Sequence, residues 1–216
     1  MSAPRDGGTP ASDNCLRYRP GELAVVYGKD QPWAFQHAAE EFAGLAGAVT
    51  GQEVEVLDEA GPWAEHAHLV LVGNAATNGV VRDLVRDGLL SFDGTNSTDE
   101  RFAMRSAALD GRDYLILAGG NPRAVLYCVY DYFERFCDVG YFWDGDQVPR
   151  AAGLPFFGID VVEEPTFRYR VVRYFGHRGL KRFHPEMWDF ATWQREMDWL
   201  VRRGSTTAAS VRRRSG

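Results

Sequence analysis

Arginine side chains near the carboxyl end of the chain are the residues best suited to binding an oxygen-rich ligand. Arg170 and Arg173 lie in an alternating segment at 167–175, and His177 follows it. A guanidinium can hold sugar hydroxyls or a uronate carboxylate with its forked N–H donors. We therefore predict Arg170, Arg173 and His177 as substrate-binding residues. The alternatives are a structural ion pair of the arginines with glutamates 163–164 and a plain surface position for the histidine.

Carboxyl groups in the same region do not have the arrangement of a hydrolytic centre. Two acids about 5–9.5 Å apart cleave a glycosidic bond, and in a barrel enzyme they lie at the carboxyl ends of strands. Residues 163–164 precede the segment that carries Arg170, whereas Asp189, Glu196 and Asp198 fall on the helix expected after it. We predict that all of these acids are solvated charges and that no residue of this chain is catalytic.

Metal and phosphate chemistry is not favoured by the residue pattern either. His66 and His68 could share one face of a strand, but no further histidine or cysteine stands at ligand spacing. The acidic turn 144–146 lacks the other oxygen ligands of a calcium loop. The glycine turns at 73–74 and 119–121 match no phosphate-binding fingerprint, so we predict tight turns that begin helices. We expect surface or strand-edge histidines, no metal and no cofactor.

The composition bounds the partners of this protein. The chain has 216 residues, of which 45% are hydrophobic, and a formal net charge of −6. This balance provides no basic field for nucleic acid or anionic lipid. The apolar stretches are far shorter than the roughly 20 residues that span a bilayer, and the amino terminus has no apolar signal region, so we expect a cytoplasmic protein. The cysteines form no paired motif, and we expect reduced thiols.

Short apolar runs that alternate with amphipathic segments predict an α/β domain at 21–163, after a disordered leader at 1–20. The run 68–72 is continuously apolar, as in an interior strand, whereas 53–57 alternates as a half-exposed strand does. An Asp-Gly pair at 110–111 predicts a hairpin, which makes the sheet mixed. Strands are expected at 23–27, 53–57, 68–72, 102–109, 114–118 and 156–162, and helices at 32–44, at 80–88 and from 122 through 133.

Residues 164–204 predict the first strand and helix of a second domain. A strand at 167–175 precedes a helix at 185–203, whose apolar face one strand alone cannot bury. That face comprises Phe190, Trp193, Met197, Leu200 and Val201. Residues 205–216 are basic and nearly free of large apolar side chains, so we expect an aberrant tail produced by truncation or a frame shift. The alternative is a genuine tail, with the helix packed back on the first domain.

The order of these segments resembles a known family of accessory domains. Residues 114–134 carry a strand, a glycine turn and an amphipathic helix, and an aromatic segment at 140–143 and a Val-Pro pair at 148–149 follow. This pattern resembles the amino-terminal domain of β-hexosaminidases, α-glucuronidases and α-N-acetylglucosaminidases, which are glycoside hydrolase families 20, 67 and 89. Residues 164–170 resemble the start of the first strand of their catalytic TIM barrel.

The resemblance implies an α/β (α+β) fold with a mixed β-sheet and packed helices, like the second domain of hexosaminidases, followed by the first βα unit of a TIM barrel. The catalytic carboxylates of these families lie on later barrel strands. The chain would therefore be a non-catalytic part of a glycoside hydrolase that supports the barrel. Its substrates would be glycans with N-acetylhexosamine or uronic acid, bound through the missing barrel.

Individual residues follow from the resemblance as well. Arg170 resembles a first-strand arginine that contacts substrate hydroxyls in hexosaminidases, although Val171 replaces the glycine that follows it there.

The alternative function is a stand-alone carbohydrate-binding or scaffold module without catalysis. In that case Tyr141, Trp143 and Trp188 would supply the faces on which sugars stack.

Overall fold

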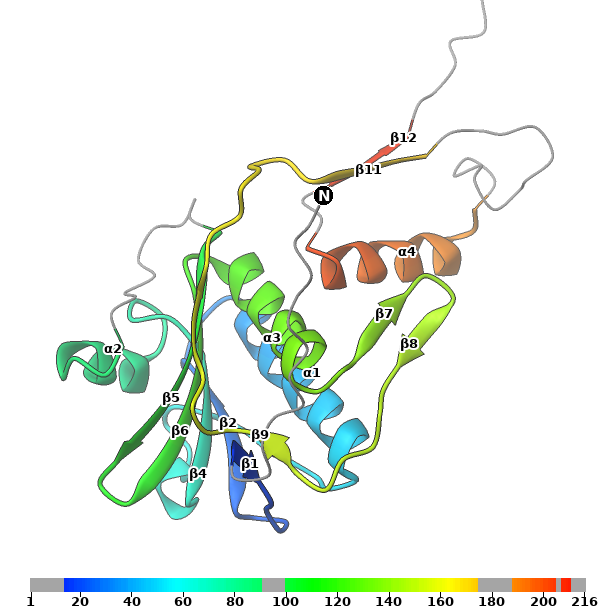
Figure 1. Ribbon diagram of the computed structural model, residues 1–216. Coiled ribbons are helices and arrows are strands. Elements are labelled where there is room, and N and C mark those ends of the chain that lie inside the picture. Colours follow the sequence, from blue (N-terminus) through cyan, green and yellow to red (C-terminus); the bar gives the residue numbers. More distant parts are fainter. Residues whose placement is uncertain (1–13, 91–99, 175–187, 205–206, 211–216) are drawn as a thin grey trace, which may run out of the picture. The chain divides into compact units, whose positions relative to one another are not determined.

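The computed structural model describes residues 14–90, 100–174, 188–204 and 207–210 of the chain (Figure 1). The chain divides into two compact units, which we call unit 1 and unit 2. Unit 1 comprises Met1–Gly140 and Gln147–Glu164, and unit 2 comprises Tyr141–Asp146 and Pro165–Gly216. Among the helices of the described ranges, none is long and apolar enough to cross a membrane.

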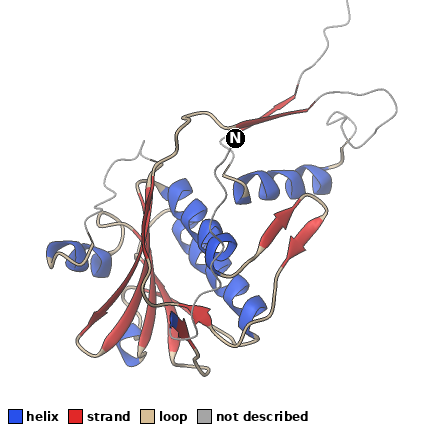
Figure 2. Cartoon of the chain, viewed as in Figure 1, coloured by secondary structure: helices blue, strands red, loops and turns tan. Residues whose placement is uncertain are grey.

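Unit 1 is built on a six-stranded mixed sheet (Figure 2). Its strands are β2 (Leu23–Tyr27), β3 (Glu55–Asp58), β4 (His68–Gly73), β5 (Phe102–Leu109), β6 (Arg112–Gly119) and β10 (Asp160–Glu163). They lie in the order β10-β5-β6-β4-β2-β3, in which β2, β3, β4 and β6 run parallel and β5 is antiparallel to both neighbours. The continuously apolar β4 lies in the interior and the half-exposed β3 at the edge, as their sequence patterns predict.

Helices cover both faces of this sheet, so unit 1 has three layers (Figure 1). They are α1 (Trp33–Thr50), α2 (Gly79–Arg86) and α3 (Pro122–Phe136), together with a short 3-10 helix, η2 (Trp63–Glu65). α1 and α3 pack against each other on one face. Val81 and Leu84 of α2 join the apolar core of the other face. This arrangement confirms the predicted fold class, a mixed sheet with packed helices.

The hairpin and the start of α3 follow from local backbone preferences. Asp110 and Gly111 have φ angles of 51° and 75°, the left-handed values that a tight reversal between β5 and β6 requires. The side chain of Asn121 accepts a hydrogen bond from Ala124 N at 2.9 Å, and Pro122 begins the helix. Both predictions are confirmed.

Helix α1 is longer than the sequence predicted. It continues through Gly44, where the predicted helix ended, because Ala46 and Val49 extend its buried face by two more positions. Burial of this face outweighs the roughly 1 kcal/mol that a glycine costs inside a helix. The helix ends at Gly51, whose φ of 75° provides the left-handed cap.

Residues 14–20, which we predicted to belong to a disordered leader, are folded onto unit 1. β1 (Cys15–Leu16) pairs antiparallel with β9 (Leu154–Pro155). Leu16 and Tyr18 are buried. The prediction is wrong for this segment because its few apolar side chains find a partner strand that lies far away in the sequence.

The last strand of the main sheet also differs from its predicted bounds, 156–162. Phe156 N donates to the carbonyl of Asn14 at 2.8 Å, so this part of the segment bonds to the amino-terminal strand region. Pairing with β5 begins only at β10, where Asp160 lies opposite Arg105. The apolar segment 156–162 therefore bonds to two different strand regions, first to the amino-terminal segment at Asn14 and then to β5.

Unit 2 contains a parallel β-α-β arrangement. Its elements are β11 (Val171–Tyr174), α4 (Phe190–Arg202) and β12 (Thr207–Ser210), preceded in the chain by the hairpin strands β7 (Gly140–Phe142) and β8 (Gly145–Gln147). β11 starts later than the predicted strand, and residues 175–187 lie outside the described residues.

The carboxyl-terminal segment 205–216 was expected to be an aberrant tail that cannot supply the next strand. Instead, Thr207–Ser210 pairs in parallel with Val171–Tyr174. The expectation is wrong for these residues because parallel pairing satisfies backbone N–H and C=O groups and does not require large apolar side chains. The chain therefore contains a second strand after α4.

Candidate functional site

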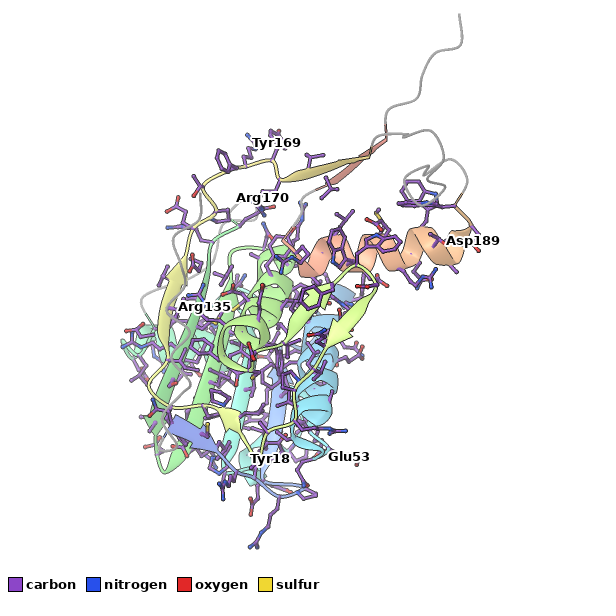
Figure 3. The ribbon with its side chains drawn as sticks, turned by 45° about the vertical axis from the view of Figure 1, so that its right-hand side comes forward. Tyr18, Glu53, Arg135, Tyr169, Arg170 and Asp189 are labelled. Carbon is purple, nitrogen blue, oxygen red and sulfur yellow. The ribbon has the colours of Figure 1, made fainter. Side chains whose placement is uncertain are left out.

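Arg170 lies immediately before β11, and its guanidinium binds backbone carbonyls of unit 2 (Figure 3). Its Nε donates to the Gly204 carbonyl at 2.6 Å, and its Nη1 donates to the Phe167 carbonyl at 2.7 Å. Gly204 follows α4, so Arg170 connects the end of that helix to the amino-terminal end of β11. Barrel enzymes bind substrate at the opposite, carboxyl ends of their strands. These contacts fit a structural clamp, and the substrate contact of Arg170 stays a prediction.

The other two predicted substrate-binding residues follow Arg170 along the chain. Arg173 is the third residue of β11, but its side chain lies outside the described part of the structure, as does all of His177. Arg173 lies toward the carboxyl end of β11, which is the end at which barrel sites form, and His177 comes three residues after that strand in the sequence. Their substrate contacts also remain predictions.

Glu163, the alternative partner for these arginines, has a partner within unit 1. Arg135 Nη2 of α3 lies 2.5 Å from Glu163 Oε1 and 2.9 Å from Asp131 Oδ2 (Figure 3). This network ties the last turns of α3 to the end of β10. It therefore anchors the strand that leads along the chain into unit 2.

A cavity of about 470 Å³ lies within unit 2, between the β7–β8 hairpin and α4. The hairpin supplies Trp143 and Asp146 to its wall, and α4 supplies Glu196, Trp199 and Arg202. The three helical residues recur at three-residue spacing, which places them on one face of α4. The cavity therefore combines aromatic, acidic and basic side chains in one small volume.

Glu196 is the most unusual residue of this cavity because it is a buried carboxylate. Its exposed fraction is 2%, and the Nε1 of Trp143 donates a hydrogen bond to its Oε2. Burial raises the pKa of the Glu196 carboxyl, and the indole hydrogen bond partly opposes the rise. The prediction of a solvated charge is wrong for Glu196. Its spacing of four residues from the buried Leu200 is the sequence signal that places it on the inner face.

The other acids of the helix behave as predicted or have a clear partner. Asp189 is exposed, and its Oδ1 accepts from Thr192 N at 2.8 Å as the N-cap of α4 (Figure 3). Hydrogen bonds from the side chain and the backbone of Thr192 lower the pKa of Asp189. Asp198 is exposed. On the hairpin, Asp146 forms an ion pair with Arg202.

Replacing Glu196 with glutamine should change how the stability of unit 2 depends on pH. A carboxyl with a raised folded-state pKa binds protons more readily in the folded state, so the wild type should lose stability as pH rises from the unfolded value through the folded one. E196Q keeps an oxygen acceptor for Trp143 and cannot ionise. Its stability relative to wild type should therefore increase from pH 4 toward pH 7.

Urea unfolding followed by tryptophan fluorescence at several pH values measures this difference. The conservative variant D198N removes an exposed carboxyl from the same helix and should show little change. A constant difference between E196Q and wild type across the range would contradict the burial of an ionisable Glu196.

The aromatic residues expected to stack on sugars are placed differently from one another. Tyr141 is 3% exposed and is therefore not available for stacking. The ring of Trp188 packs edge to face against Trp193, with ring centroids 4.9 Å apart. Trp143 is 38% exposed and lines the cavity, so it keeps the predicted potential for stacking.

The glycine turns at the carboxyl ends of the parallel strands form a buried polar network in unit 1. Asn78 is fully buried, caps α2, and donates to the carbonyls of Val26 and Val72 at 3.2 and 3.3 Å. Asn74 donates to the Gly119 carbonyl at 2.9 Å. These bonds confirm the prediction of tight turns that begin helices.

The two histidines considered as metal ligands pair with carboxylates. His66 Nε2 lies 3.1 Å from Glu55 Oε2, and His68 Nδ1 lies 3.0 Å from Asp113 Oδ2. His66 is only 6% exposed, so of the two predicted positions, at the surface or at a strand edge, the surface position is wrong for it. It lies two residues before β4, and Glu55 gives its ring a polar partner. Within the described residues, no group of three or more His, Cys, Asp or Glu could hold a metal ion.

Comparison with known proteins relates this chain to glycoside hydrolases. No protein-family model matches it. It is 28% identical to the α-N-acetylglucosaminidase of Homo sapiens over 112 residues, which cover 47% of this chain and 15% of the human protein. Its fold is similar to that of a family 115 4-O-methyl-α-glucuronidase with specificity for decorated arabinogalactans. The TM-score is 0.59 at 13% identity, and the match covers 92% of this chain and 26% of that one.

A family 89 glycoside hydrolase from Clostridium perfringens also aligns, with a TM-score of 0.46 and 16% identity over 83% of this chain and 16% of its own. The chain thus spans about a quarter or less of the length of each of these proteins. The comparisons bear out the resemblance to α-glucuronidases and α-N-acetylglucosaminidases. The fold of this chain is thus similar to part of a glycoside hydrolase of known structure.

Proposed function

We propose that this chain supplies a non-catalytic, amino-terminal part of a glycoside hydrolase, in which unit 1 is an accessory domain that supports a catalytic barrel. One observation carries the proposal. A three-layer α/β domain is followed directly in the chain by β11, α4 and β12, which form a parallel β-α-β unit. Parallel strands connected by helices are the repeating unit of a TIM barrel.

Exposed apolar side chains in unit 2 support this assignment. Phe167 and Tyr169, next to β11, are 69% and 71% exposed, and Phe190 of α4 is 82% exposed. Of the predicted apolar face of α4, Leu200 is buried and Phe190 is not. A two-stranded sheet with one helix cannot cover such side chains, whereas further strands and helices of a barrel would.

The proposed substrates of the whole enzyme are glycans that contain N-acetylhexosamine or uronic acid. The names of the two relatives, an α-N-acetylglucosaminidase and a 4-O-methyl-α-glucuronidase, support these two sugar classes. In the proposed barrel, Arg173 and His177 would contact substrate from the carboxyl end of β11. Arg170 would connect the amino-terminal end of β11 to the end of α4 through its hydrogen bond to the Gly204 carbonyl.

The absence of a catalytic role for the acids of the cavity is part of the proposal. Glu196 accepts the indole N–H of Trp143, and Asp146 is paired with Arg202. These two acids, like the other lining acids Asp144 and Asp198, come from the hairpin and the helix, whereas barrel enzymes place their catalytic carboxyls at the carboxyl ends of strands. The cavity acids therefore fit binding and packing roles better than hydrolysis.

The coding sequence downstream of the Gly216 codon tests the proposal against a stand-alone module. We expect one of the three reading frames to continue with alternating apolar strands and amphipathic helices, and with acidic residues just after some of the strands. Reading the full-length messenger RNA checks this. A messenger that ends at this codon, with no such segments in any frame, would overturn the proposal and leave the stand-alone module.

A further inference from the structure

The cavity of unit 2 has the size and the wall chemistry of a small-molecule site. Its volume of about 470 Å³ lies within the range of roughly 300–1,000 Å³ that ligand pockets occupy. Among the residues that the structure describes, those that line the cavity belong to the hairpin 142–146 and to α4. The described lining therefore lies within unit 2.

The ring of Trp143 is held in a fixed orientation at this cavity. Its Nε1 donates to the carboxylate of Glu196, which is only 2% exposed. Trp143 itself remains 38% exposed, and Phe142 beside it is 50% exposed. An indole whose polar end is engaged and whose ring stays accessible is a stacking platform that loses little conformational entropy on binding.

Polar groups around the ring match a ligand that carries many hydroxyls. Asp144 and Asp198 are exposed carboxylates that can accept hydrogen bonds, and Arg195 is an exposed guanidinium that can donate them. The aromatic ring binds the apolar C–H face of a sugar, and the charged groups bind its edge. A pyranose offers both surfaces in one molecule.

The charges of the side chains that line the cavity favour neutral sugars over anionic ones. Among the described residues, the cavity is lined by four carboxyl groups, on Asp144, Asp146, Glu196 and Asp198, and by the two guanidinium groups of Arg195 and Arg202. This excess of negative charge disfavours an anionic ligand such as a uronate or a phosphate. A neutral sugar carries no such penalty.

We propose that this cavity is a binding site for a neutral pyranose, either a hexose or an N-acetylhexosamine, and that it acts without cleaving the sugar. The site goes beyond the accessory role of unit 1. The described residues that line it come from the β7–β8 hairpin and α4. It would hold a sugar residue of a glycan between the β7–β8 hairpin and α4.

Ligand-observed NMR on the full chain tests the proposal, with N-acetylglucosamine, galactose and glucuronic acid as probes. We expect saturable binding of at least one neutral sugar and weaker binding of glucuronic acid. W143A should weaken the binding at least about tenfold, because it removes the stacking platform. W33A is the matched control, since Trp33 is 74% exposed, belongs to unit 1 and does not line the cavity.

Three results would overturn the proposal: no saturable binding of any neutral sugar, an affinity unchanged in W143A, or tighter binding of glucuronic acid than of the neutral sugars. If W143A does not fold, judged by circular dichroism, the double variant D144A/D198N replaces it. Both of its positions are exposed, and it should weaken binding by several fold. The coding-sequence test is independent, so failure of the sugar site and failure of the barrel proposal can be told apart.

Discussion

Replacing Gly28 with alanine is expected to destabilise unit 1 by about 3 kcal/mol or more. A Cβ at this position would lie 1.4 Å from the carbonyl oxygen of Thr77 and 2.6 Å from its carbonyl carbon. Both atoms belong to the backbone, so no side-chain rotation can relieve the overlap. The turn before α2 would have to move, and with it the hydrogen bonds that Asn74 and Asn78 make to neighbouring strands.

Hydrogen exchange of the β4 amides, compared between wild type and G28A, measures the free energy of opening of unit 1. Gly44 provides the matched control, because it is an exposed glycine inside α1 and a Cβ added there would meet no atom within 4 Å. G44A should stabilise the protein by roughly 0.5–1 kcal/mol. If G28A were tolerated as well as G44A, the close approach of the turn to β2 would be wrong.

Replacing Asn78 with alanine is expected to destabilise unit 1 by about 2–4 kcal/mol, the second-largest effect we predict. The variant removes the acceptor that caps α2 at Val81 N and the donor shared by the carbonyls of Val26 and Val72. Because Asn78 is fully buried, water cannot reach the unpaired backbone groups and replace the lost hydrogen bonds. Urea unfolding followed by far-UV circular dichroism gives the difference in free energy of unfolding.

Two further variants separate the contributions of Asn78. N121A removes the cap of α3, where the side chain accepts from Ala124 N, and should cost about 1 kcal/mol. N78D keeps the cap acceptor but places a carboxylate against two carbonyl oxygens, so it should be at least as destabilising as N78A. If N78D were as stable as wild type, the bonds from Asn78 to the two strands would have no energetic importance.

Local sequence signals were sufficient for the central elements of unit 1. The continuous apolar run of β4 indicated an interior strand, the Asp110-Gly111 pair indicated the hairpin, and Asn121 with Pro122 indicated the start of α3. Each of these features is determined by residues within a few positions of one another. That is the range over which periodicity, turn preference and capping act.

Features that depend on distant partners could not be predicted in the same way. Leu16 is buried because β1 pairs with residues 154–155, and no local pattern announces a two-residue strand. Glu196 is buried because Trp143, far away in the sequence, supplies an N–H donor. A glutamate on a helix is ordinarily solvated, so only its shared face with Leu200 indicated otherwise.

In the candidate site, too, residue types could be identified from the sequence, whereas contacts with distant partners could not. The sequence pattern predicts a strand across Arg170 and Arg173, but β11 begins at Val171. Arg170 donates instead to the carbonyls of Phe167 and Gly204. The cavity was not predicted at all, because it forms between a hairpin and a helix that are separated in the sequence. Of its aromatic lining residues, Phe142, Trp143 and Trp199, the sequence analysis singled out Trp143 for stacking from residue type alone.

A hydrolysis assay of the purified full chain tests the non-catalytic assignment most directly, with chromogenic α- and β-glycosides of N-acetylglucosamine, galactose and glucuronic acid as substrates. We expect no turnover above the buffer rate, while an intact glycoside hydrolase in parallel cleaves the same substrates. Turnover by this chain that is lost in E196Q would contradict the assignment, because the carboxyls of the unit 2 cavity would then perform the hydrolysis assigned to a barrel.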